Sequence, residues 1–123
     1  MNVLTGKISA IQQCHDLSLV SIECASITLT SIIIETPETA DYLKIGNAID
    51  VVFKETELII SRKGEQLISL QNKIPSTILK INKGKLLSSI TLAFKGFELN
   101  SIITSNAVNS LELEEGMEVI AMV

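Results

Sequence analysis

The chain has 123 residues and a net charge of −4, and 19 Ile, 15 Leu and 7 Val stand against three Phe, one Tyr and no Trp. This aliphatic content argues against a disordered chain. The acidic balance, the single arginine and the scarcity of aromatic residues argue against a nucleic-acid-binding protein. No apolar run approaches the roughly 20 residues of a membrane helix, and the N-terminus lacks a signal-peptide pattern. We therefore expect a cytoplasmic protein with reduced cysteines and no membrane or nucleic-acid contact.

Alternation of apolar and polar residues predicts short, half-buried strands along the first half of the chain. A Thr-Pro-Glu start signal interrupts them and predicts one or two helical turns over 36–43. A turn at 44–47 follows, with Gly46 where a positive φ is expected. The strands are predicted over residues 7–11, 18–23, 26–30, 48–53 and 57–61, and residues 62–66 link the two halves of the chain.

The second half repeats the first at an offset of 70 residues. Residues 2–53 align with 72–123 without a gap, giving 11 identities in 52 pairs. The identities include Asn2 with Asn72, Ser18 with Ser88, and Gly46 with Gly116, so they are not confined to Ile and Leu. A helical turn over 105–113 and a strand over 118–123 are therefore predicted as well.

The repeat unit suits an all-β fold of two tandem five-stranded barrels of the oligonucleotide/oligosaccharide-binding type, each with a short helical turn. We expect a first repeat at 1–63, a linker at 64–68 and a second repeat at 69–123. Val123 aligns with Phe53, so the second repeat lacks a counterpart of the last strand. Because an open sheet edge is normally covered, we expect another subunit or a different strand to close it.

Three spaced motifs can be placed in both repeats, each complete in at least one of them: an Asn-x-Leu-x-Gly-x-Ile opening, a central Ser-Ile-Ile-Thr, and a Leu-x-x-Gly turn that leads into a strand. They stand at residues 2–8, 31–34 and 43–49, and again at 72–78, 101–104 and 113–119. In this combination the chain resembles the Mop, or molbindin (TOBE-like), family of molybdate- and tungstate-binding domains, in a tandem arrangement.

The resemblance implies a site for a tetrahedral oxyanion at a subunit or repeat interface. Carried over position by position, it implies the site residues Ser69, Gln71, Thr104, Lys54 and the backbone around Glu55. Three positions depart from the family pattern. Gln71 replaces an arginine, Ile34 stands where the first repeat would have the threonine, and Glu55 places a carboxylate beside the matching lysine.

The resemblance implies reversible, non-catalytic binding of molybdate or tungstate for storage, homeostasis or sensing, without an organic cofactor. It also implies a homo-oligomer, a trimer first and a dimer next. The alternative is a Mop-like structural or regulatory oligomerisation module that has lost ligand binding, such as the effector part of a molybdate transporter or a transcriptional regulator.

Enzymatic and metal-binding roles find little support in the residues. The chain has a single histidine, no glycine-rich phosphate loop and no nucleophile elbow, so we expect no catalysis. The run Cys14-His15-Asp16 would point its side chains to alternate faces of a strand, so we expect no metal site there.

Overall fold

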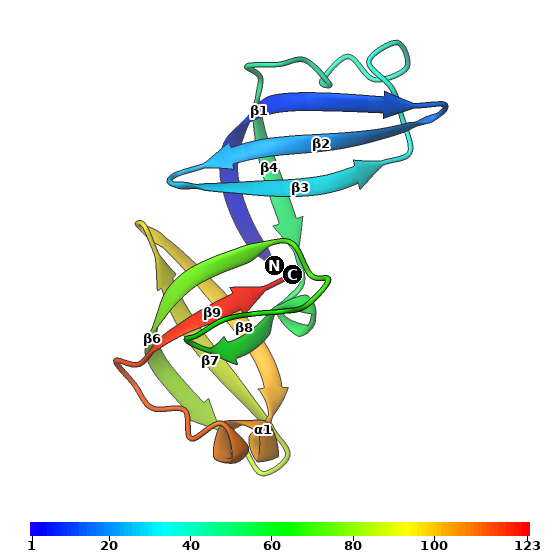
Figure 1. The fold of residues 1–123 in the computed structure, drawn as a ribbon. Helices are drawn as coiled ribbons and strands as arrows, with labels where there is room; N and C mark the ends of the chain where they lie inside the picture. The colour runs from blue at the N-terminus through cyan, green and yellow to red at the C-terminus, as the bar shows by residue number, and fades with distance from the viewer. The chain divides into compact units, whose positions relative to one another are not determined.

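The computed structural model describes residues 1–123, and the chain divides into two compact units (Figure 1). Leu4–Val51 form the N-terminal unit, and Met1–Val3 with Val52–Val123 form the C-terminal unit. The fold is nearly all-β, as the sequence predicts. No helix has the length and apolar character needed to cross a membrane.

The N-terminal unit is built on a four-stranded sheet of order β3-β2-β1-β4. Strands β1, β2 and β3 lie side by side in Figure 1, and β2 pairs antiparallel with both β1 and β3. The first residues of β1 and the last of β4 belong to the C-terminal unit. The strands are β1 (Asn2–Cys14), β2 (Leu17–Cys24), β3 (Ile27–Ile33) and β4 (Ala48–Phe53).

The C-terminal unit contains a five-stranded sheet of order β5-β9-β6-β7-β8, a short 3-10 turn and one short helix. Its elements are η1 (Glu55–Glu57), β5 (Ile59–Arg62), β6 (Lys73–Lys83), β7 (Leu87–Phe94), β8 (Phe97–Thr104), α1 (Ser105–Ser110) and β9 (Glu118–Met122).

The structure confirms the 70-residue repeat in detail. Each first strand carries an irregularity at the same place, between Ile8 and Ala10 in β1 and between Ile78 and Lys80 in β6. The turn glycines also behave alike. The N–H of Gly46 donates to the Ile8 carbonyl at 2.7 Å with φ +92°, and that of Gly116 donates to the Ile78 carbonyl at 2.7 Å with φ +86°.

Alternation along the strands fills the interior of each unit. Every second residue of β7 is buried, from Ser88 through Ile90 and Leu92 to Phe94, and β2 shows the same pattern from Ser18 to Cys24. Burying one Ile or Leu side chain contributes about 1.5–3 kcal/mol, so these inward faces supply the main stabilisation of each sheet.

Residues 36–43 contain one helical turn of the one or two predicted. The Thr36 carbonyl accepts from the N–H groups of Thr39 and Ala40, both at 2.9 Å, while the Thr36 N–H donates to the Thr39 hydroxyl. This bond from the first residue to the side chain three residues later is that of a capping box, so the predicted start signal is present. In the second repeat the predicted helix is present as α1, and the Thr104 hydroxyl caps it by accepting from the Ala107 N–H at 3.1 Å.

The strand predicted as the last of the first repeat pairs within the C-terminal unit. Ile59 lies opposite Met122, and Arg62 lies opposite Val119, so β5 covers the outer edge of β9. Leu58 and Ile60 are buried there, at 1% and 6% exposure. The compact units divide between residues 51 and 52, and the repeat boundary after residue 63 stays a prediction. The N-terminal sheet therefore has four strands, one fewer than predicted. The second repeat, which was expected to have an open sheet edge, is completed by β5 from the first repeat.

Candidate functional site

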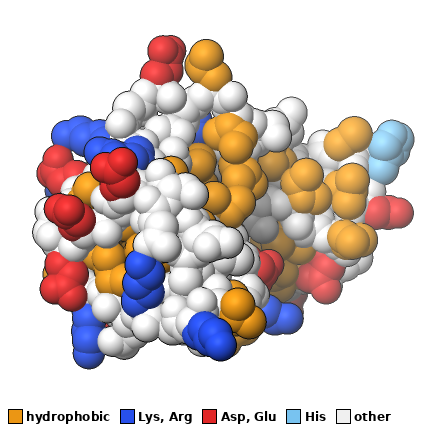
Figure 2. Space-filling model, turned by 90° about the horizontal axis from the view of Figure 1, so that it is seen from below, with side chains coloured by type: hydrophobic (Ala, Val, Ile, Leu, Met, Phe, Trp, Pro, Cys, Tyr) orange, Lys and Arg blue, Asp and Glu red, His pale blue; other side chains and the backbone are white.

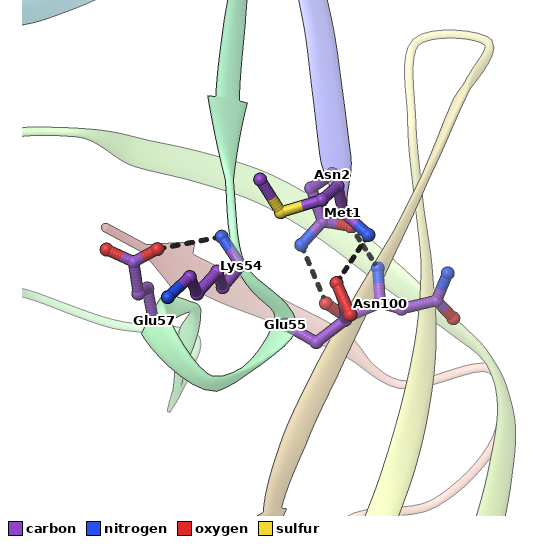
Figure 3. A network of polar contacts seen from close by, with 6 residues as sticks. All are labelled: Met1, Asn2, Lys54, Glu55, Glu57 and Asn100. Carbon is purple, nitrogen blue, oxygen red and sulfur yellow. Dashed lines mark hydrogen bonds and ion pairs between the residues drawn. The ribbon is translucent and has the colours of Figure 1, made fainter.

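Lys54 and Glu55 lie at η1, the turn that leads into β5. The Lys54 N–H donates to the Glu57 carboxylate at 2.8 Å, and the Lys54 side chain is exposed (Figure 3). The Glu55 carboxylate forms an ion pair with the Met1 ammonium group at 2.6 Å. A hydrogen bond from the Met1 ammonium group, and a further one from the backbone of Glu55, hold the pKa of the Glu55 carboxyl below its usual range.

Asn2 holds the beginning of β1 against β8. Its side-chain amide donates to the Asn100 carbonyl at 2.8 Å and accepts from the Asn100 N–H at 2.8 Å, and Asn2 is only 2% exposed (Figure 3). These two bonds to one backbone unit fix the start of β1 to β8.

Ser69 and Gln71 lie in the segment that leads into β6, and both are exposed. Because β5 and β6 both run antiparallel to β9, they begin at the same end of the sheet. Two strand spacings, roughly 10 Å, separate them there. Lys54 and Glu55 therefore precede one of these strands, and Ser69 and Gln71 precede the other.

Thr104 lies where β8 runs into α1. The Ser101 hydroxyl donates to the Leu58 carbonyl at 2.6 Å, which places the residue after η1 beside the middle of β8. Thr104 follows three residues later, roughly 10 Å further along the strand. The fifth predicted residue is therefore separated along β8 from the η1 group.

The sequence interpretation missed the neighbours of Thr104. The Ser105 hydroxyl is buried, contacts the Ser88 hydroxyl at 2.8 Å and donates to the Gly84 carbonyl at 2.7 Å. The Lys83 ammonium group donates to the side-chain carbonyl of Asn109 on α1. A comparison of the aligned repeats could have singled out these residues, because the first repeat has Gln13 and Glu35 in place of Lys83 and Ser105.

Neither cysteine forms a disulfide, and no group of three His, Cys, Asp or Glu side chains could hold a metal ion. Cys14 is exposed. Cys24 is buried, its thiol donates to the Thr5 carbonyl at 3.4 Å, and burial raises the pKa of this thiol.

Residues 68–123 match the model of the TOBE domain family. The high-resolution structure of a molybdate-binding protein from Sporomusa ovata is 38% identical, covers 47% of this chain and 87% of that chain, and has a TM-score of 0.46. The chain belongs to the TOBE family. This confirms the resemblance to Mop, or TOBE-like, proteins.

A second match extends over nearly the whole of this TOBE protein. A crystal structure of the cytoplasmic molybdate-binding protein ModG, in a form with molybdate bound, matches at a TM-score of 0.88 and 25% identity, covering 99% of this chain and 89% of that chain. A search of curated protein sequences finds no match.

Proposed function

We propose that this TOBE protein binds a tetrahedral oxyanion, molybdate or tungstate, reversibly in the cytoplasm and without chemical conversion. The observation that carries the proposal is the structural match to molybdate-bound ModG over 99% of the chain, at a TM-score of 0.88. Storage, homeostasis or sensing of the anion are the roles that fit a binding protein without a catalytic constellation.

The chemistry of the proposed ligands suits a dianion. A dianion gives up its water shell only when several donors replace it, and charged donors give the stronger bonds. The proposed donors are the hydroxyls of Ser69 and Thr104, the amide of Gln71, the ammonium group of Lys54 and the backbone N–H of Glu55.

The placement of these donors supports an interface site between chains. Thr104 lies at the end of β8, whereas Lys54, Ser69 and Gln71 lie where β5 and β6 begin. Donors separated by about 10 Å contact a single small anion together when a neighbouring chain supplies some of them. We therefore propose a homo-oligomer, a trimer first and a dimer next.

The alternative is a TOBE module that keeps the fold as a structural or regulatory oligomerisation unit and binds no anion. Two observations favour it. Gln71 brings no charge where the family pattern has arginine, and Glu55 places a carboxylate beside Lys54. The N-terminal ammonium group partly offsets that carboxylate.

Thermal unfolding with molybdate, tungstate and sulfate separates the two candidates. Binding to the native state alone stabilises it by RT ln(1 + [L]/Kd), about 2.7 kcal/mol at a ligand concentration of 100 Kd. The binding proposal predicts a clear rise in Tm with molybdate or tungstate. An unchanged Tm with all three anions, in an intact oligomer, would favour the non-binding module.

A further inference from the structure

The two units differ at the outer edge of one strand. In the C-terminal unit the order β5-β9-β6-β7-β8 places β5 along the outer edge of β9, whereas in the N-terminal unit the order β3-β2-β1-β4 leaves β4 as an edge strand. Strand β4 is the counterpart of β9, because residues 48–53 align with 118–123 at the 70-residue offset. The N-terminal sheet therefore has an edge that its counterpart in the C-terminal unit has covered.

Strand β5 shows what a covering strand supplies. Ile60 of β5 lies opposite Ala121 of β9, and the two strands are antiparallel. Leu58 and Ile60 are buried, at 1% and 6% exposure. The Leu58 carbonyl also accepts from the Ser101 hydroxyl of β8 at 2.6 Å. The segment thus joins β9 to β8 through buried apolar side chains and through its backbone.

The residues that such a strand would cover are less buried in the N-terminal unit. In the C-terminal unit the residues that lie opposite β5, or bond to the residue before it, are at most 1% exposed, namely Val119, Ala121 and Ser101. Their counterparts are all half-buried, namely Ile49, Val51 and Ser31. An edge strand also presents a row of unpaired backbone donors and acceptors. The outer edge of β4 can therefore accept a further strand.

The N-terminal unit carries the net charge of the chain. Residues 4–51 contain two Lys and six Asp or Glu, a net charge of −4, whereas the C-terminal unit contains eight basic and eight acidic residues. Around the single histidine, His15, Figure 2 shows an acidic and several apolar side chains and no lysine or arginine. The N-terminal unit therefore attracts a basic segment.

One of the six carboxylates lies on β4 itself. Asp50 stands where β9 has Ile120, the residue opposite Ser61 of β5. The Asp50 side chain is exposed and accepts from the Thr5 hydroxyl at 2.8 Å, which leaves further acceptor positions on the carboxylate. Opposite charges directly across a strand pair stabilise the pair. A Lys or Arg is therefore favoured in an added strand at the position of Ser61.

The same carboxylate disfavours pairing of β4 with β4 of a second copy. Each strand would bring an Asp50 and a unit of net charge −4 to the contact, and β4 contains no basic residue. Like charges across a strand pair destabilise it. The charges therefore favour a strand from a different protein.

We infer that the outer edge of β4 binds an extended basic segment of another protein, with apolar residues at the positions of Leu58 and Ile60 and a Lys or Arg at that of Ser61. The segment extends the four-stranded sheet antiparallel to β4, as β5 extends the other sheet on β9. Main-chain hydrogen bonds provide affinity, and the cation opposite Asp50 provides specificity. This interaction goes beyond the proposed anion binding and does not depend on it.

The test is fluorescence anisotropy with the full chain and a labelled peptide of residues 57–63 that carries Ser61→Lys. We expect saturable binding. In the protein, Asp50→Lys should raise Kd for this peptide about fivefold or more, because it replaces an attraction across the strands by a repulsion. The same variant should bind a peptide with Ser61→Glu more tightly than the wild-type protein does.

A matched variant separates this contact from the charge of the whole unit. Asp16→Lys makes the same change of charge at an exposed aspartate in the turn after β1, away from β4, and should stay within about twofold of wild type. Circular dichroism verifies that both protein variants are folded.

Backbone methylation tests strand addition itself. In an antiparallel pair each residue directs its N–H and C=O to one side, and the next residue directs its own to the other side. Of two peptides N-methylated at Ile59 or at Ile60, one should lose binding and the other should keep it. Equal binding by the two methylated peptides would overturn the inference.

Two further results would contradict a strand site for another protein. One is an unchanged Kd with Asp50→Lys, or no saturable binding of the Ser61→Lys peptide up to about 1 mM. The other is an oligomer, measured by light scattering, that Asp50→Lys alters, because a second copy would then occupy the edge. Titration with molybdate is a separate measurement, so the proposed function stands or fails independently of these results.

Discussion

Asn2 and Asn100 exchange two hydrogen bonds although 98 residues separate them in the chain. The Asn2 side-chain amide donates to the Asn100 carbonyl and accepts from the Asn100 N–H, both at 2.8 Å. Strand β8 is an edge of the five-stranded sheet. The side chain thus supplies a donor and an acceptor that a neighbouring strand would otherwise provide, and it fixes the start of β1 to the C-terminal unit.

Asn2→Ala should destabilise the protein by about 1–3 kcal/mol, because it removes both bonds and leaves part-buried backbone groups of Asn100 unpaired. Urea unfolding followed by circular dichroism measures the loss. Asn106→Ala, at an exposed position of α1, is the control and should stay within about 0.5 kcal/mol of wild type. Equal urea midpoints for Asn2→Ala and wild type would show that the two bonds have no net effect.

Leu58→Ala should cost about 2–5 kcal/mol, the range for truncating a fully buried leucine. Leu58 is 1% exposed, and its carbonyl accepts the Ser101 hydroxyl at 2.6 Å, so the residue joins the start of β5 to β8. Leu67→Ala, at a residue that is 89% exposed, should have little effect. If the two variants melt at the same temperature, β5 does not belong to the C-terminal unit.

The two thiols should react at very different rates. Cys14 is exposed, whereas Cys24 is buried and its raised pKa leaves less of the reactive thiolate near neutral pH. A thiol reagent should label one cysteine of the native protein quickly and the second only after denaturant is added. Cys14→Ser should abolish the fast phase. Fast labelling that persists in Cys14→Ser would contradict the burial of Cys24.

The sequence predicts those features of the fold that depend on the local residue pattern and on the repeat. Apolar alternation locates the strands, and the 70-residue offset places the turn glycines Gly46 and Gly116 correctly, because these signals are read within a few residues. The repeat likewise predicts α1, and the start signal at Thr36 predicts the turn to which the Thr39 hydroxyl contributes.

Local sequence signals of this kind do not determine which strands pair over long distances in the chain. The alternation over 57–61 fits either sheet, so only the structure shows that β5 pairs with β9. The positions of the site residues relative to one another cannot be predicted from local signals either. The resemblance selects Ser69, Gln71, Lys54 and Thr104, but only the structure shows that Thr104 caps α1 and that Lys83 donates to Asn109 on the same helix.

Isothermal titration of the full-length chain with molybdate measures anion binding itself, with sulfate as the matched tetrahedral anion and light scattering to measure the oligomeric state. We expect saturable heat with molybdate or tungstate and a fixed number of anions per chain. Absence of heat with both anions in a folded protein would contradict the proposed function and would leave the chain as a TOBE module without a ligand.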